Sequence, residues 1–106
     1  MRLPHRPELD QPAGVMHGGA LASLIDTVVV PAVGSAYSYV PVMFTLSLSI
    51  NYLGAVVGQD AVAEGWVVRR GRAIVFSEAE VRDASGQLAA TGSLVYKISS
   101  RRQETA

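Results

Sequence analysis

The stretch Gly14-Val-Met-His-Gly-Gly-Ala-Leu-Ala-Ser-Leu-Ile-Asp-Thr27 decides how this chain of 106 residues folds. From position 20 to position 30, every residue except one serine, one aspartate and one threonine is apolar, which predicts a buried helix. The helix should begin near Gly18. Pro31 is expected to end or kink it, because proline lacks an N–H group and clashes with the preceding turn. Gly34 and Ser35 then favour a stop.

Two features of this helix point to chemistry. The N–H groups of Gly18 and Gly19 lie in the first turn, where they lack intrahelical acceptors and can face an oxyanion. Asp26 places a carboxylate in an apolar segment, where an unpaired charge is costly. Together they outline an acyl-transfer site. Because Gly18 and Asp26 are eight residues apart, or roughly 12 Å along a helix, one small carbonyl group contacts both only if they come from two chains.

These residues also have purely structural explanations. Asp26 can be a buried acid that is satisfied by Arg82, by Lys97 or by neighbouring hydroxyl groups. His17 is expected to be structural rather than catalytic, since the sequence shows no partner for a proton shuttle. The glycine pair can serve close backbone packing, which is compatible with oxyanion binding.

The remainder of the chain has the patterns of strands. Apolar and polar residues alternate from Val42 to Tyr52, which predicts a half-buried strand. Trp66 and Tyr96 lie in later strands and are expected to pack in the core or at an interface. The further strands are predicted over residues 61–70, 73–82 and 87–98.

Turns and termini complete the prediction. Residues 70–72 (Arg-Gly-Arg) form a tight connection, and residues 83–86 (Asp-Ala-Ser-Gly) a hairpin turn. Residues 1–12 are irregular, with at most one short strand within residues 3–9, and residues 99–106 form a frayed tail. One α+β domain over residues 1–106 follows, with one long helix wrapped by a curved antiparallel sheet of four to five strands.

Composition narrows the function classes. The net charge is zero, so nucleic acid and acidic membranes are not expected partners. The chain has no cysteine, which excludes disulfides and thiol catalysis, and its scattered acids and two histidines predict no metal site. Since there is no signal-peptide pattern and no span for a bilayer, a cytoplasmic protein is expected. An open sheet edge in so small a domain favours pairing with a second copy.

In order and spacing, these motifs resemble the hot-dog fold acyl-CoA thioesterases, specifically the phenylacetate-degradation (PaaI-like) family. The resemblance runs from about Gln11 to Ile98. Its core is Gly-x-x-His-Gly-Gly at residues 14–19, with Asp26 nine residues after the histidine. It continues through Asn-Tyr-Leu at residues 51–53, the Arg-Gly-Arg turn, and the strand that starts with Gly-Gln-Leu-Ala-Ala-Thr-Gly-Ser at residue 86.

The resemblance implies a role for each site residue. Asp26 would act as general base or nucleophile, and the Gly18 N–H would polarise the thioester carbonyl. Gln11 would orient the water or the carbonyl, and His17 would brace the loop through hydrogen bonds. Thr45 and Ser47 would line the acyl end. The coenzyme A nucleotide and its phosphates would be held by Tyr52, Arg69, Arg70, Gly71 and Arg72.

The implied function is hydrolysis of a small aromatic or medium-chain acyl-CoA by a homodimer, assembled as a dimer of dimers. No cofactor is expected, since coenzyme A is part of the substrate. Two alternatives are a hot-dog acyl-thioester dehydratase or hydratase, and a non-catalytic acyl-CoA binding module. Release of free coenzyme A separates hydrolysis from both. The binding-module alternative gives the Asp26 carboxylate no function.

Overall fold

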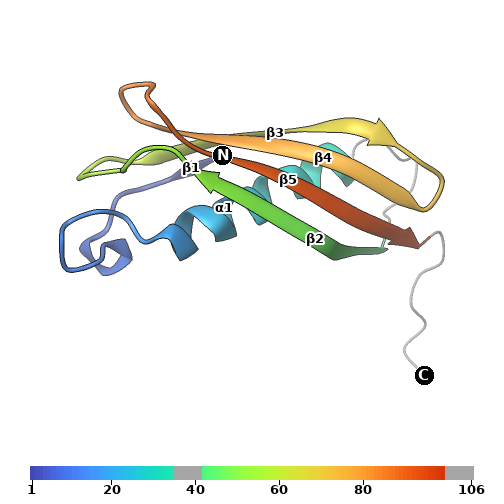
Figure 1. The fold of residues 1–106 in the computed structure, drawn as a ribbon, viewed down its shortest axis with the longest axis horizontal. Coiled ribbons are helices and arrows are strands. Elements are labelled where there is room, and N and C mark those ends of the chain that lie inside the picture. Colours follow the sequence, from blue (N-terminus) through green and yellow to red (C-terminus); the bar gives the residue numbers. More distant parts are fainter. Residues whose placement is uncertain (35–41, 100–106) are drawn as a thin grey trace.

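A computed structural model describes residues 1–34 and 42–99 of the chain. One helix, α1, packs against one face of a five-stranded antiparallel sheet with the strand order β1-β3-β4-β5-β2 (Figure 1). This is the architecture expected for a hot-dog fold. The elements are β1 (Arg2–Leu3), the short 3₁₀ helix η1 (Pro7–Leu9), α1 (Gly18–Gly34), β2 (Val42–Tyr52), β3 (Ala61–Arg70), β4 (Ile74–Asp83) and β5 (Leu88–Ser99).

The N-terminal segment differs most from the sequence prediction. A short strand was predicted within residues 3–9. The strand β1 instead ends at Leu3, and the 3₁₀ helix η1 occupies residues 7–9. Long-range contacts decide this: β1 pairs with the start of β3, and the carboxylate of Asp60 accepts hydrogen bonds from the Arg2 side chain (3.0 Å) and the His5 N–H (2.7 Å). At the other end, Ser99 belongs to β5, and the rest of the predicted tail lies outside the described residues.

Helix α1 supplies one side of the core. Its buried side chains are Leu21, Leu24, Ile25, Val29 and Val33. The helix continues through Pro31 to Gly34, so of the two effects expected of Pro31, an end to the helix is wrong, and the helix reaches the glycine at which a stop was favoured. Proline in the last turn removes one backbone hydrogen bond near the helix end, where few bonds remain to be lost.

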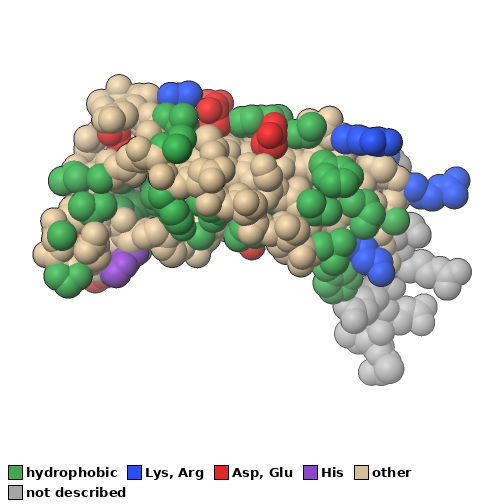
Figure 2. All heavy atoms as spheres, viewed as in Figure 1, with side chains coloured by type: hydrophobic (Ala, Val, Ile, Leu, Met, Phe, Trp, Pro, Cys, Tyr) green, Lys and Arg blue, Asp and Glu red, His purple; other side chains and the backbone are tan. Residues whose placement is uncertain are grey.

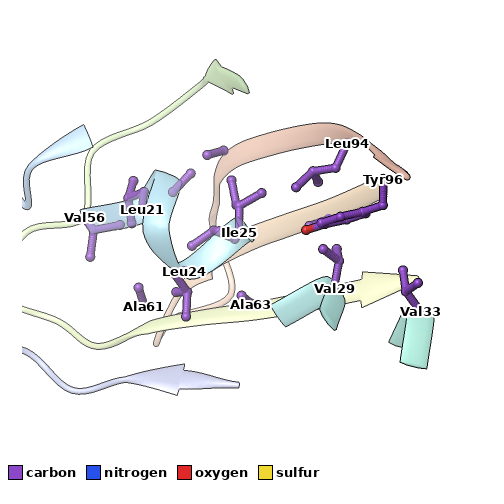
Figure 3. Packing of buried hydrophobic residues seen from close by; sticks show 14 of the residues in the cluster. Leu21, Leu24, Ile25, Val29, Val33, Val56, Ala61, Ala63, Leu94 and Tyr96 are labelled. Atoms are coloured by element: carbon purple, nitrogen blue, oxygen red, sulfur yellow. The ribbon is translucent and has the colours of Figure 1, made fainter. Parts of the chain in front are cut away.

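Two glycines let the helix lie close to the sheet. A Cβ atom on Gly65 would lie 2.8 Å from Cγ1 of Val29, and one on Gly92 would lie 2.7 Å from Cγ2 of Ile25. Figure 3 shows Ile25 and Val29 in the cluster between helix and strands, with Tyr96 beside them. This contact fixes the height and rotation of α1, and with them the position of Asp26.

Strand β2 is the open edge of the sheet. Its large apolar side chains are exposed: Phe44 by 49%, Leu46 by 56% and Leu48 by 40%. The prediction of a half-buried strand is therefore wrong for a single chain, because α1 packs mainly on β3 and β4. Hydrophobic side chains gather on the surface near the start of β2 and the end of β5 (Figure 2). A bulge between Thr45 and Ser47 interrupts the pairing of β2 with β5.

Candidate active site

The first part of the site is the N-terminal end of α1 and the loop that leads into it. The loop closes on itself: the His17 N–H donates to the Leu9 carbonyl (2.8 Å), and the Gln11 N–H donates to the Val15 carbonyl (2.8 Å). Within the described part of the chain, the N–H groups of Gly18 and Gly19 have no acceptor. They are therefore available to an oxygen atom with negative charge.

Tyr52 closes the other side of this helix end. Its hydroxyl donates to the Gly18 carbonyl at 2.8 Å, and a Cβ atom on Gly18 would lie 3.1 Å from the ring. Gln11, Gly18 and Tyr52 line one cavity of about 350 Å³. The structure thus brings together three residues that the sequence placed in different roles.

Asp26 forms the second part of the site. Its half-buried carboxylate accepts hydrogen bonds at Oδ1 from the hydroxyls of Tyr96 (3.0 Å) and Thr45 (3.3 Å). Of the alternatives for Asp26, contact with hydroxyl groups is therefore correct. Arg82 instead donates to Glu80 and to the Gly86 carbonyl.

Tyr96 was predicted only to pack in the core or at an interface, and its place in the site was not predicted. It is 2% exposed, so the packing assignment is confirmed, but its hydroxyl also reaches Asp26. Burial first, and then the neighbouring Asp26 carboxylate, raise the pKa of Tyr96 above its ordinary value. The available signal was a tyrosine at an inward position of β5, since a buried phenol needs a polar partner.

Two further residues predicted for the site, Ser47 and His17, do not contribute their side chains to either part of it. Ser47 lies beyond the bulge, where it pairs with Val95 rather than with Tyr96, so it does not join Thr45 beside Asp26. The imidazole of His17 is exposed and has no hydrogen bond within residues 1–34 and 42–99. Its bracing of the loop comes from the backbone N–H instead of the ring.

The arginine turn lies at the opposite end of the sheet from Tyr52. Arg70 pairs with Val75, which pairs with Tyr96, whereas Tyr52 pairs with Ala90. The turn therefore lies at the Asp26 end, and Arg69 and Arg72 are exposed. Within one chain, Tyr52 and this turn do not converge, and neither do Gly18 and Asp26. The predicted roles of these residues stay predictions.

The described residues include no group of three metal-ligating acids, histidines or cysteines. No helix among them is long and apolar enough to cross a bilayer. The site therefore has two separate parts: the Asp26 carboxylate, which accepts hydrogen bonds from hydroxyl groups, and the N–H groups of Gly18 and Gly19 at the start of α1. These are the parts needed to activate a nucleophile and to stabilise an oxyanion.

Comparison with known proteins gives three relevant likenesses. A Saccharolobus solfataricus protein that is named as an esterase by assignment is 32% identical to this chain over 93 residues, which is 85% of this chain. The chain spans 64% of that relative's length. The BH2602 protein of Bacillus halodurans, solved with CoA, is 26% identical, with a TM-score of 0.87 over 92% of this chain and 69% of its own.

The E. coli PaaI protein from the phenylacetic acid degradation operon has a TM-score of 0.83 over 92% of this chain and 70% of its own. At 18% identity, that likeness shows the shared fold alone, so the phenylacetate-degradation branch stays a prediction. The family model described as the thioesterase superfamily matches residues 13–90 of this chain. The chain belongs to the thioesterase superfamily.

Proposed function

We propose that the protein hydrolyses the thioester bond of an acyl-CoA, with Asp26 and the Gly18 N–H as its catalytic groups. The observation that carries the proposal is the Asp26 carboxylate, fixed by hydroxyls at 3.0 and 3.3 Å in the middle of an otherwise apolar helix. A binding module has no need for such a group. Membership of the thioesterase superfamily supports the same reaction.

Two routes are open to Asp26. As a general base, its carboxylate takes a proton from water while the water oxygen bonds to the thioester carbon. As a nucleophile, it bonds to that carbon itself, and water hydrolyses the resulting anhydride. In both routes the C–S bond breaks, coenzyme A leaves as the thiolate and takes up a proton, and the Gly18 N–H stabilises the oxyanion.

Completion of the site requires a second copy of the chain. Asp26 contacts Thr45 near the start of β2, and Gly18 contacts Tyr52 at its end. Because β2 is an unpaired edge, it can pair antiparallel with β2 of another copy. A two-fold axis near Leu48 then places Thr45 of one chain opposite Tyr52 of the other, so Asp26 faces the partner's helix start. The exposed apolar side chains of β2 support this pairing.

The same two-fold pairing unites the groups proposed for coenzyme A. Tyr52 of one copy approaches the end of the partner's sheet that carries the arginine turn. Arginine side chains bind phosphate groups through charge-assisted hydrogen bonds. The CoA-bound Bacillus halodurans relative supports a site for this nucleotide. We extend the proposal to a small aromatic or medium-chain acyl group and to a dimer of dimers.

The reaction is tested by following coenzyme A release with a thiol reagent across a panel of acyl-CoA substrates. Asp26→Asn should keep the fold, as measured by circular dichroism, and lose at least ~10²-fold in kcat. Near wild-type turnover in this variant would refute the catalytic assignment. Substrate binding without coenzyme A release in the wild type would favour a binding module, and a change in the acyl chain without release would favour a dehydratase or hydratase.

The shared site is tested by mixing two inactive variants. An Asp26→Ala chain and a Gly18→Val chain each spoil both sites of their own homodimer. A heterodimer of the two retains one site with both catalytic groups intact, so activity should return after subunit exchange. If exchange is demonstrated with labelled chains and activity stays absent, the two-chain site is wrong.

A further inference from the structure

The two oxygens of the Asp26 carboxylate have different surroundings. The hydroxyls of Tyr96 and Thr45 both point at Oδ1, at 3.0 and 3.3 Å. Over residues 1–34 and 42–99, no group donates a hydrogen bond to Oδ2. One oxygen is therefore held while the other is open.

Tyr96 is a rigid support for this contact. Its ring packs in the core near Ile25 and Val29, and its hydroxyl points toward the helix (Figure 3). The hydroxyl lies 3.1 Å from the Asp26 main-chain carbonyl as well as 3.0 Å from Oδ1. It therefore touches both the backbone and the side chain of the same residue. Since burial raises its pKa, the hydroxyl keeps its proton and remains a donor at neutral pH.

We infer that Tyr96 and Thr45 are positioning residues that hold Oδ1 and leave Oδ2 as the reacting atom of Asp26. An oxygen that accepts two hydrogen bonds is a poorer base and nucleophile, because its lone pairs are already engaged. The inference rests on the proposed hydrolase function and assigns the reacting atom within that site.

The assignment fits either chemical route. In the base route Oδ2 takes the proton of the attacking water, and that proton passes to the coenzyme A thiolate when the C–S bond breaks. In the nucleophile route Oδ2 forms the bond to the acyl carbon, and water later cleaves it. In both, the hydroxyl protons stay on Tyr96 and Thr45, which act as hydrogen-bond donors and not as acids.

Tyr96→Phe tests the inference, because it deletes one donor and keeps the ring. Hydrogen bonds to a carboxylate favour its charged form, so the loss of one donor should move the acid limb of the kcat/KM profile to higher pH. Within residues 1–34 and 42–99, the hydrogen bonds to the Asp26 carboxylate come from Tyr96 of β5 and the non-titrating Thr45 of β2, while the hydroxyls of Ser23 and Thr27 donate to carbonyls of α1. A shift in the acid limb therefore reports on the carboxylate.

Matched variants separate positioning from packing. Ser77→Ala removes a buried hydroxyl on β4 that donates to the Leu94 carbonyl and not to Asp26, so it should leave the acid limb in place. Thr45→Val should move the limb as Tyr96→Phe does, and Thr45→Ser should restore it. Thr45→Val on the open edge also provides the test if Tyr96→Phe fails to fold.

An unchanged acid limb in the folded Tyr96→Phe and Thr45→Val enzymes, with Asp26→Asn inactive, would overturn the inference and leave the proposed function intact. High activity of Asp26→Asn would instead refute the proposed function itself. A limb that moves equally in Ser77→Ala would also overturn the inference, because it would show a general effect of a lost buried hydroxyl.

Discussion

Replacing Gly92 by alanine tests how closely α1 must lie on the sheet. The new Cβ atom would lie 2.7 Å from Cγ2 and 3.5 Å from Cδ1 of Ile25. Carbon atoms prefer separations of about 3.5–4.0 Å, so the helix must retreat by roughly 1 Å or Ile25 must leave its rotamer. Overpacking of this kind costs about 1–3 kcal/mol. In a domain of this size, each kcal/mol lowers Tm by roughly 4–8 °C.

The assay is urea unfolding followed by circular dichroism, with thermal melts alongside. Gly34→Ala is the matched control, because its Cβ atom would meet nothing within 4 Å, and no loss of stability is expected there. Ile25→Leu removes the offending Cγ2 atom while conserving volume, so in the double variant with Gly92→Ala most of the loss should be recovered. Wild-type stability of Gly92→Ala, or strictly additive losses in the double variant, would refute the close-approach argument.

The other predictions concern substrate binding, pH and assembly. Replacing the three arginines of the β3–β4 turn (Arg69, Arg70 and Arg72) by alanine should raise KM for acyl-CoA and leave kcat nearly unchanged; hydrolysis of a short thioester without the nucleotide should not change, and an unchanged KM would place the nucleotide elsewhere. The Ser85 hydroxyl, followed by backbone N–H groups, lowers the pKa of Asp83, so this carboxylate stabilises the fold at neutral pH and loses that effect as the pH falls below about 4. Asp83→Asn should therefore flatten the acid side of the unfolding free energy against pH, and an unaltered slope would contradict this. Leu48→Lys should prevent the proposed β2-paired dimer in sedimentation experiments, because two like charges would meet at its axis, and a persistent dimer would exclude pairing through β2.

The sequence predicted the main elements because their patterns are local. The apolar run after Gly18 and the alternation after Val42 each have a period that backbone geometry imposes. The turn ending at Gly86, which has φ of +94°, needs a residue that adopts that conformation easily. These features depend on neighbours in the chain and are readable without tertiary information.

The site required tertiary information at one particular place, the bulge between Thr45 and Ser47. Strict alternation would put Thr45 on the same face as Ser47 and away from α1. The bulge reverses the order, so Leu48 pairs with Leu94 and Thr45 pairs with Tyr96, both on the helix side. No local pattern announces that irregularity, and the contact between Thr45 and Asp26 depends on it. The pairing of β1 with β3 was missed for a similar reason, since it joins distant segments.

The two edges of the sheet differ in charge, and this bears on how further copies could add to it. β2 offers apolar side chains along its length, whereas the far edge is covered at its start by β1 and bears the charged Glu64, Arg69 and Arg70 along β3, beside the exposed Trp66 and Val68. Charged side chains discourage strand addition, whereas each edge strand has a bulge, between Thr45 and Ser47 in β2 and between Val67 and Arg69 in β3. Pairing through β2 uses the same surface on both copies, so it consumes the receptive edge. If the proposed β2 dimer forms, further strand addition would have to use β3, where the charged side chains oppose it.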